Sequence, residues 1–285
     1  HPNLKTVGVT GTNGKSTAVS LLSHILNEAG VKNVLGGNIG TAVFDLKIEE
    51  EAKPQWVVLE LSSYQIDLCP SFRPDISVIL NIAPDHVDRH GTVDNYAAVK
   101  ERLFEKEGTA IICSDDDYTS AMLKRAIAVE NREVIEFSCQ DVQESNALKG
   151  DHNRQNIACA YAVAEKIGLT KDEIQRGTDS FPGLNHRQYL VRTINDVAYV
   201  NDSKATNAAS SAMALQCRNN VYWIVGGRKK ENGLDGLEKF SDHINHAFLI
   251  GEAAEEFSDW FEKESINYSR CHIMDKAVDK AHIMA

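Results

Sequence analysis

The segment that decides the fold reads Thr10-Gly11-Thr12-Asn13-Gly14-Lys15-Ser16-Thr17. The β-branched run before it, from Lys5 to Val9, is typical of a buried strand. Apolar residues at helical spacing follow it, and Gly30 marks the end of that helix. A glycine-rich loop between a strand and a helix directs backbone N–H groups toward an anion. The segment therefore predicts a phosphate-binding loop.

Side chains of the loop indicate a phosphorylated ligand and a metal ion. Lys15 offers positive charge to the outer phosphates, and the hydroxyl group of Ser16 or Thr17 can bind Mg²⁺. Val9 stands where the general pattern G-x-x-x-x-G-K-[ST] has glycine, so the loop is a compact variant. The alternative is a tight glycine turn that only packs a helix against a sheet. We assign phosphate binding to Gly11, Thr12, Asn13, Gly14, Lys15, Ser16 and Thr17.

Composition narrows the class of protein. The 285 residues are 42% hydrophobic and 25% charged, which is ordinary for a globular chain and enough for two domains. The formal net charge of -11 argues against a general nucleic-acid or membrane-surface binder. The sequence shows neither an apolar run of membrane-spanning length nor a signal peptide, so we expect a cytoplasmic protein. The six cysteines are scattered without a C-x-x-C pair and predict buried, reduced thiols.

Strand-like and helix-like segments alternate, which predicts an α/β fold with mostly parallel sheets flanked by helices. Phe181-Pro182-Gly183 marks a boundary, so we predict domains at residues 1–184 and 185–285. Asn195-Asp196, between two strand-like segments, predicts a hairpin in the second domain. The sequence stops inside a helix-like segment, 275–285, and we therefore expect a fragment of a longer protein.

Several polar residues follow the predicted strands, where ligands bind in α/β sheets. Glu60 lies near the end of one strand and can hold Mg²⁺, or it can form a salt bridge or a helix cap. His86 lies in a loop rich in acids and histidines, where a single histidine is more often structural or solvated. Lys100 lies within a helix, and its residue type alone predicts solvent exposure. Three glycines around Asn38 indicate close backbone approach to a ligand or a tight loop.

Seven motifs follow one another between residues 10 and 207: T-G-T-N-G-K-S-T, G-G-N-I-G, L-E-L-S-S-Y-Q, N-I-A-P-D-H-V-D-R-H, D-H-N-R-Q-N, F-P-G-L-N-H-R and N-D-S-K-A-T-N. In this order they resemble the Mur ligase family, and among its members those that add D-glutamate. The resemblance implies a P-loop-type central ATP-binding domain followed by an incomplete, Rossmann-like domain. It also implies that the N-terminal domain holding the UDP of the substrate, and the last segment, are missing.

The reaction implied by the resemblance is an ADP-forming amide ligation in peptidoglycan precursor synthesis. The carboxylate of a UDP-linked muramoyl-alanine substrate becomes an acyl phosphate, which the amine of D-glutamate attacks. Both reactants of the first step are anions, so charge neutralisation should dominate catalysis. We expect ATP and Mg²⁺ as cofactors, a monomer, and no nucleic-acid or membrane partner. The alternatives are a folylpolyglutamate synthetase-like ligase, a different Mur ligase, or an ATP-binding module without ligase activity.

The resemblance also implies roles for individual residues. Ser16 and Glu60 correspond to ligands of one Mg²⁺, and His86 to a ligand of a second. Lys100 matches a lysine that the family carbamylates, and its carbamate can serve a metal. The catalytic assignments are Lys15, His86, Lys100 and Lys204. The remaining assignments are adenine or ribose for Asn153 and Asn156, phosphates and ribose for Arg187 and Asp202, and substrate for Asn38, Lys204, Thr206 and Lys230.

Overall fold

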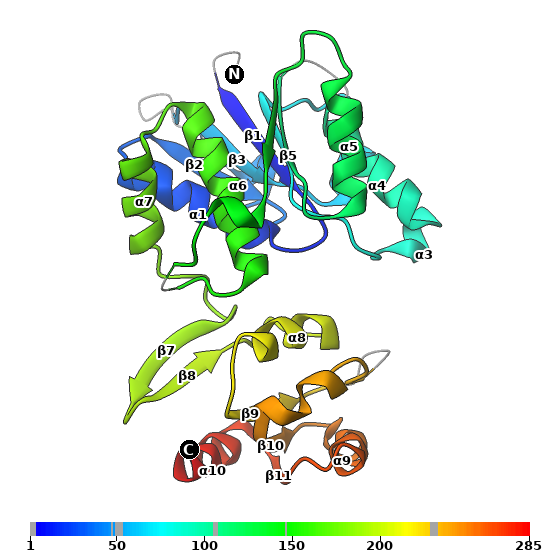
Figure 1. Cartoon of the computed structure of the whole chain (residues 1–285), viewed down its shortest axis with the longest axis vertical. Coiled ribbons are helices and arrows are strands. Elements are labelled where there is room, and N and C mark those ends of the chain that lie inside the picture. The colour runs from blue at the N-terminus through cyan, green and yellow to red at the C-terminus, as the bar shows by residue number, and fades with distance from the viewer. Residues whose placement is uncertain (1–3, 47, 49–53, 105–107, 146, 229–232) are drawn as a thin grey trace. The chain divides into compact units, whose positions relative to one another are not determined.

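The computed structural model describes residues 4–46, 48, 54–104, 108–145, 147–228 and 233–285 (Figure 1). The chain divides into two compact units, His1–Gly183 and Leu184–Ala285. Unit 1 and unit 2 each have their own sheet and their own hydrophobic core. Within the described residues, no helix is both long enough and apolar enough to cross a membrane.

Unit 1 is built on a six-stranded sheet in which every strand pair is parallel. Apolar, β-branched residues bury its central strands on both faces, as expected for a parallel sheet covered by helices. In spatial order the strands are β2 (Asn33–Gly37), β3 (Trp56–Glu60), β1 (Lys5–Thr10), β4 (Ile76–Ile79), β5 (Thr109–Cys113) and β6 (Val134–Phe137).

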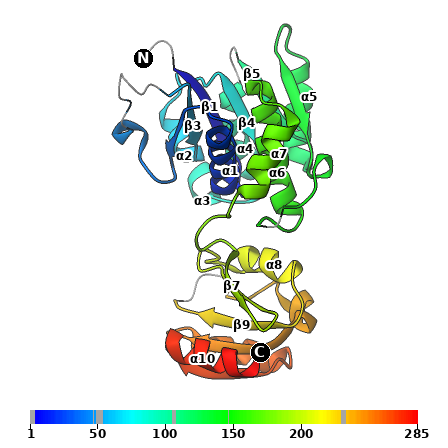
Figure 2. The same cartoon turned by 90° about the vertical axis from the view of Figure 1, so that its left-hand side faces the viewer.

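Helices cover both faces of this sheet. On one face lie α1 (Lys15–Glu28), α6 (Asp151–Ile167) and α7 (Lys171–Ser180), side by side in Figure 2. The other face packs against α2 (Ser63–Leu68), α4 (Val93–Glu101) and α5 (Asp117–Ile127) through one apolar cluster. The short elements of unit 1 are α3 (Val87–His90), η1 (Val43–Asp45), η2 (Arg102–Phe104) and η3 (Cys139–Asp141).

The strand order places the loop that follows β1 at a switch point. β1 lies between β3 and β4. Beyond β3 lies β2, and beyond β4 lie β5 and β6. In open parallel sheets, ligands bind outside the carboxyl ends of the strands where the order reverses. The phosphate-binding loop predicted from sequence, which starts at Thr10, therefore stands where this architecture places a ligand.

Unit 2 combines a hairpin with a smaller parallel sheet. β7 (Tyr189–Ile194) and β8 (Val197–Asn201) pair antiparallel, which confirms the predicted hairpin. Asn195 and Asp196 have φ of 48° and 64°, the left-handed conformation that a tight two-residue turn needs. The parallel sheet and its helices are β9 (Val221–Gly226), β10 (Ile244–Ile250), β11 (Tyr268–His272), α8 (Ala208–Gln216), η4 (Glu238–His243), α9 (Ala254–Lys263) and α10 (Met274–Met284).

The small sheet of unit 2 is covered on both faces, as the Rossmann-like prediction requires. One cluster joins Leu215 of α8 and Phe257 of α9 to Leu249 of β10. A second cluster packs Ala277 of α10 against Phe248, also of β10. The α/β prediction is therefore confirmed in both units.

The prediction of buried thiols is wrong for part of the set. All six cysteines are free, and Cys113, Cys159 and Cys271 are buried as expected. Cys69 is exposed, because it follows the end of α2, where the chain leaves the core. Residue type indicated burial, but the position at a helix end decided against it.

Candidate nucleotide-binding site

The loop after β1 enters α1 without a capping side chain. Gly14 occupies the N-cap position with φ of 81°, in the left-handed region. Among the described residues, no side chain caps α1 and no acid lies in its first turn. The first N–H groups of α1 and the positive end of its dipole are therefore suited to an anion.

Gly14 leaves no room for a side chain, because an added Cβ would lie 2.1 Å from Asn156 Oδ1. Asn156 is 2% exposed, and within the described chain its Oδ1 is a buried atom without a hydrogen-bond partner. Its Nδ2 donates to Asn153 Oδ1 at 3.2 Å, and Asn153 Nδ2 donates to Lys149 O at 2.9 Å. Helix α6 thus places Asn156 against the loop, and a contact of either asparagine with adenine or ribose stays a prediction.

Asn81, which comes two residues after β4, holds the loop through its backbone and its side chain. The Thr12 N–H donates to Asn81 O at 2.9 Å. The Asn13 N–H donates to Asn81 Oδ1 at 2.8 Å, and Asn81 Nδ2 donates back to Asn13 O at 3.3 Å. Sequence reasoning did not single out Asn81, although it begins a quoted motif after a buried strand.

Lys15 keeps its ammonium group at the loop. Its Nζ donates to Gly11 O and to Thr12 O, both at 2.9 Å. The side chain is half-buried, so its charge is partly shielded from water. Lys15 therefore supplies positive charge beside the N-terminus of α1, where the first N–H groups of that helix are exposed to a ligand.

Glu60 joins two other residues that the sequence predicted. It is the last residue of β3, as expected, and it is 3% exposed. Its Oε2 accepts a hydrogen bond from Ser16 Oγ at 2.8 Å, and its Oε1 accepts one from Asn38 Nδ2 at 2.9 Å. Hydrogen bonds thus join Ser16, Glu60 and Asn38 into one group.

Lys100 is buried, contrary to the solvent exposure that its residue type predicts. It is 1% exposed, and its Nζ donates to Thr10 Oγ1 at 3.1 Å and to Gly11 O at 3.0 Å. Burial and the neighbouring Lys15 charge lower the pKa of Lys100 to about 7, although Asp85 and Glu60 oppose the shift. Helix α4 carries Lys100 beneath the loop, a placement that only long-range packing decides.

Tyr96, one turn before Lys100 on α4, is a site residue that sequence reasoning missed. Its hydroxyl group lies 3.2 Å from Thr12 Oγ1, and Lys100 Nζ lies 4.7 Å from its ring centroid. Burial raises the pKa of Tyr96 to about 12, although the hydrogen bond with Thr12 opposes the shift. The signal available in the sequence was the i, i+4 spacing of Tyr96 and Lys100.

His86 is exposed and lies in a strained backbone conformation. Its φ is 49° at the N-cap of α3. Its Nε2 lies 3.6 Å from Asp85 Oδ2, and its ring packs edge-on against Tyr64 with centroids 5.0 Å apart. The ring centroid of Tyr96 lies 6.3 Å away, so His86 borders the same cluster as the loop. Its assignment as a metal ligand stays a prediction.

The predicted residues of unit 2 lie on two loops that contact each other. The Lys204 N–H donates to His186 O at 3.0 Å, and Asp202 Oδ1 accepts from the Gln188 N–H at 3.0 Å. Burial raises the pKa of the Asp202 carboxyl group, although the charge of Arg187 is among the effects that oppose the shift. Thr206 is exposed on the second of these loops, and Lys230 lies outside the described residues.

The donor set in unit 1 fits Mg²⁺ bound together with a phosphate. Mg²⁺ in such sites uses one or two protein ligands and completes its shell with phosphate oxygens and water. Ser16 Oγ and Glu60 Oε2 provide one hydroxyl group and one carboxylate beside the loop. Among the described residues, no group of three or more His, Cys, Asp or Glu side chains is arranged to hold a metal without a phosphate. The buried Oδ1 of Asn156, which has no hydrogen-bond partner among the described residues, also suits a polar ligand at the loop.

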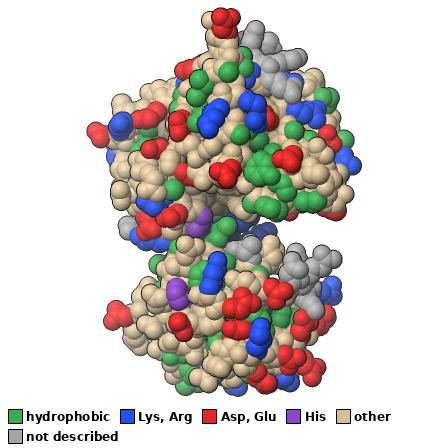
Figure 3. Space-filling view, turned by 45° about the vertical axis from the view of Figure 1, so that its right-hand side comes forward, with side chains coloured by type: hydrophobic (Ala, Val, Ile, Leu, Met, Phe, Trp, Pro, Cys, Tyr) green, Lys and Arg blue, Asp and Glu red, His purple; other side chains and the backbone are tan. Residues whose placement is uncertain are grey.

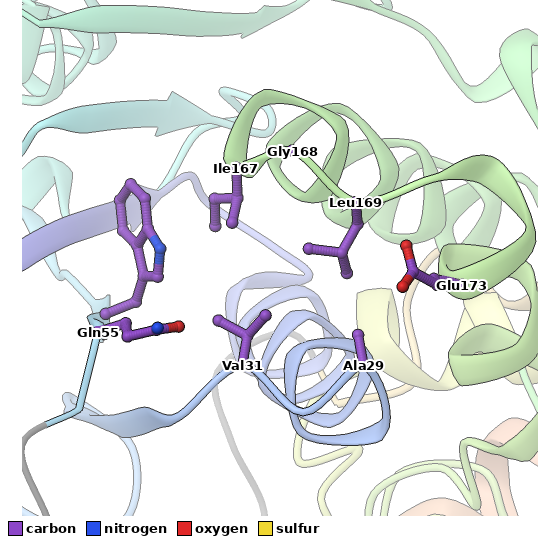
Figure 4. A pocket seen from close by; sticks show the side chains of 8 residues that line it. Ala29, Val31, Gln55, Ile167, Gly168, Leu169 and Glu173 are labelled. Atoms are coloured by element: carbon purple, nitrogen blue, oxygen red, sulfur yellow. The ribbon is translucent and has the colours of Figure 1, made fainter.

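A cavity of about 260 Å³ lies at the opposite end of the six-stranded sheet from the loop (Figure 4). Trp56 lines it at the start of β3, whereas Glu60 ends that strand, so the cavity is a strand length away from the loop. Ala29 at the end of α1 and Ile167 at the end of α6 line it as well.

On the face shown in Figure 3, acidic and basic side chains are interspersed over each unit.

Comparison with known proteins places the chain in context. Residues 9–168 match the family described as Mur ligase middle domain. A protein of Nitrobacter winogradskyi named UDP-N-acetylmuramoylalanine–D-glutamate ligase is 40% identical, over 90% of this chain and 61% of its own length. Proteins with the same name from Agrobacterium fabrum and Paramagnetospirillum magneticum are 40% and 39% identical and cover 98% and 100% of this chain. The chain spans 64% and 67% of the length of these two relatives.

Solved structures show the same fold at low sequence identity. MurF from Acinetobacter baumannii matches with a TM-score of 0.77 and 19% identity, over 99% of this chain and 71% of that one. UDP-N-acetylmuramate-alanine ligase MurC from Thermotoga maritima matches with a TM-score of 0.69 and 16% identity, over 93% of this chain and 66% of that one.

Proposed function

The chain belongs to the Mur ligase family, and from this premise we propose that it is the ATP-binding and C-terminal part of a D-glutamate-adding ligase. The reaction proposed is ATP-dependent, ADP-forming amide formation between the carboxylate of UDP-N-acetylmuramoyl-L-alanine and the amine of D-glutamate, in peptidoglycan precursor synthesis. We propose that unit 1 binds ATP and that unit 2 is the C-terminal ligase domain. We also propose a cytoplasmic location and a monomer.

The observation that carries the proposal is the set of charges gathered around the end of β1. Lys15 and Lys100 both donate hydrogen bonds to Gly11 O, and the Glu60 carboxylate accepts one from Ser16. One ammonium group, one buried amine with a pKa of about 7 and one buried carboxylate at a glycine-rich loop suit a phosphate bound with Mg²⁺. Simple packing of α1 against the sheet would need none of these charged groups.

Each of these groups has a role in activating a carboxylate. When bound, Mg²⁺·ATP supplies the phosphoryl group that makes the carboxylate reactive. The Lys15 ammonium group and the N–H groups of α1 neutralise the charge of the phosphates. This matters because repulsion between the carboxylate and the phosphate is the main barrier to their reaction. Ser16 and Glu60 would hold Mg²⁺, and His86 a second ion. Asn38, held by Glu60, would orient the acyl side of the substrate.

Lys100 is suited to carbamylation. Carbon dioxide reacts with a neutral amine, forms an N–C bond and releases a proton, so a lysine with its usual pKa reacts poorly near neutral pH. With the pKa of Lys100 at about 7, a large fraction of the amine is neutral there. The resulting carbamate would be an anionic metal ligand beside Glu60, which agrees with the role that the resemblance implies.

For residues of unit 2 we propose the roles that the resemblance implies. Arg187 and Asp202 would contact the phosphates and the ribose, and Lys204 and Thr206 the reacting groups. Lys230, outside the described residues, would meet a D-glutamate carboxylate. Asn153 and Asn156 of α6 would contact adenine or ribose.

Two measurements test the proposal. Calorimetric titration with ADP tests the nucleotide site, and release of phosphate from ATP tests the ligase reaction. We expect Lys15→Ala to abolish ADP binding, since it removes the cation of the loop. Unchanged ADP affinity in that variant would overturn the nucleotide site. Phosphate release that depends on UDP-N-acetylmuramoyl-L-alanine and D-glutamate supports the ligase, whereas release only with L-glutamate and a folate would point to a folylpolyglutamate synthetase-like enzyme. ADP binding without any substrate-dependent release would identify a binding module.

A further inference from the structure

A chain of hydrogen bonds connects the phosphate-binding loop to a surface carboxylate. The Asn13 N–H donates to Asn81 Oδ1 at 2.8 Å, and Asn81 Nδ2 donates to Gln155 Oε1 at 2.6 Å. Gln155 Nε2 then donates to Asp115 Oδ2 at 3.0 Å. The four residues come from the loop, the end of β4, the first turns of α6 and the turn after β5. We call this chain of four the amide relay.

The relay has a fixed direction because it ends on a carboxylate. Burial alone would raise the pKa of Asp115, but hydrogen bonds from Ser138 Oγ, Gln155 Nε2 and the Cys139 N–H outweigh it and lower the pKa. An ionised carboxylate only accepts hydrogen bonds, so Gln155 must present its NH₂ group to Asp115. Gln155 therefore presents its oxygen to Asn81. Asn81 in turn presents its NH₂ group to Gln155 and its oxygen to the loop.

This direction matters at Asn13. Only an oxygen of Asn81 can accept the Asn13 N–H, and a reversed amide would place two donors against each other. Asn13 directly precedes Gly14, whose conformation starts α1. The peptide that leads into the anion-binding end of α1 is thus oriented by groups well outside the loop.

We propose that Asp115 and Gln155 are positioning residues for the nucleotide phosphates, acting through Asn81 on the loop. The inference rests on the proposed nucleotide site. It adds two residues that the family motifs did not assign to any role, and it gives α6 a second function. Besides carrying Asn156 against Gly14, α6 transmits the orientation set by Asp115.

Removing the carboxylate separates this role from simple electrostatics. Asp115→Ala deletes a negative charge near an anion site, so charge alone predicts tighter ADP binding. Loss of the relay predicts the opposite sign, because Gln155 can then reverse and place its NH₂ group against that of Asn81, which the backbone of Asn13 holds in place. We expect ADP affinity to fall by about three- to tenfold, the effect of losing one well-placed hydrogen bond in the bound state. Asp117→Ala is the matched control, since it deletes an exposed carboxylate two residues away that belongs to no part of the relay.

A double-mutant cycle tests whether the effect passes through Gln155. Gln155→Met keeps the side-chain length, leaves Asp115 in place and breaks the connection. It should weaken ADP binding to a similar extent, and Asp115→Ala should weaken it no further in the Gln155→Met background. The measurement is calorimetric titration of the full chain with ADP, alongside thermal melting to verify folding.

Each outcome is informative. Weakened binding in both single variants without additivity supports the relay. Unchanged or tighter binding in Asp115→Ala, as expected for Asp117→Ala, overturns it, and so does full additivity in the double variant. Lys15→Ala serves as the reference: if that variant binds ADP normally, the nucleotide site itself is wrong, whereas its failure to bind together with a silent Asp115→Ala rejects only the relay.

Discussion

Lys100 Nζ donates a hydrogen bond to the carbonyl oxygen of Gly11 at 3.0 Å, although 89 residues separate the two along the chain. The contact brings the middle of α4 to the first glycine of the phosphate-binding loop. Lys15 donates to the same carbonyl oxygen, so one backbone acceptor is shared by two amines. The burial of Lys100 and, after it, the repulsion between the two amines lower the pKa of Lys100.

The stability of the protein should depend on pH through Lys100. Its folded-state pKa is about 7 and its unfolded-state pKa is the usual 10.5, so between these values the unfolded chain binds the extra proton. The free energy of unfolding of wild type, minus that of Lys100→Met, should therefore rise as the pH increases from 7 to 9. Urea denaturation in carbon dioxide-free buffer at several pH values measures it. A flat difference would contradict the shifted pKa.

Gly14 and Gly30 form a matched pair for testing the loop geometry. Both have positive φ, 81° and 75°, but a Cβ at Gly14 would meet Asn156 at 2.1 Å, whereas nothing lies within 4 Å at Gly30. We expect Gly30→Ala to destabilise the fold by about 1 kcal/mol through backbone strain alone. Gly14→Ala should destabilise it by about 2–4 kcal/mol and abolish ADP binding, because Asn156 must also shift. Thermal melting and ADP titration of both variants check this, and equal effects would refute it.

Glu60→Gln should reveal whether the buried carboxylate serves a metal ion. The substitution keeps the shape but removes the charge that accepts hydrogen bonds from Ser16 and Asn38. We expect ADP affinity in the presence of Mg²⁺ to fall at least tenfold, since a ligand of the ion is lost. Without Mg²⁺, affinity should stay the same or increase, because one negative charge near the phosphates is gone. Titrations with ADP in Mg²⁺ and in EDTA give both values, and equal losses in the two buffers would mean that Glu60 is only structural.

The thiols should react in an order set by burial. Cys69 is exposed, whereas Cys113 and Cys159 are buried, and burial raises the pKa of Cys159 to about 12. A thiol-specific reagent should therefore label Cys69 in the native protein within minutes and label Cys113 and Cys159 only after unfolding. Mass spectrometry of digests identifies the labelled sites. Rapid native labelling of Cys159 would contradict the packing of α6.

Local signals in the sequence were sufficient for the loop, the strand that precedes it and the hairpin at Asn195-Asp196. Each depends on residues close together in the chain: glycines for unusual φ values, β-branched runs for strands, and apolar spacing for helices. Glu60 was also found, because its position at a strand end can be read from the apolar run before it. The resemblance then added roles that no spacing could supply.

The tertiary structure alone decided which of these residues meet and which charges are buried. Asn38 reaches Glu60 only because β2 and β3 are neighbours in the sheet, and Lys100 reaches Gly11 only because α4 packs beneath the end of β1. Asn81, Tyr96, Gln155 and Asp115 received no site role from the sequence, since an amide, a phenol or a carboxylate is ordinary anywhere in a chain. Their positions depend on contacts across 40 to 84 residues, and such contacts are determined by the packing of the whole sheet. Residues close together in the chain thus located the predicted phosphate site, and the packing of the sheet set which groups hold that loop in shape.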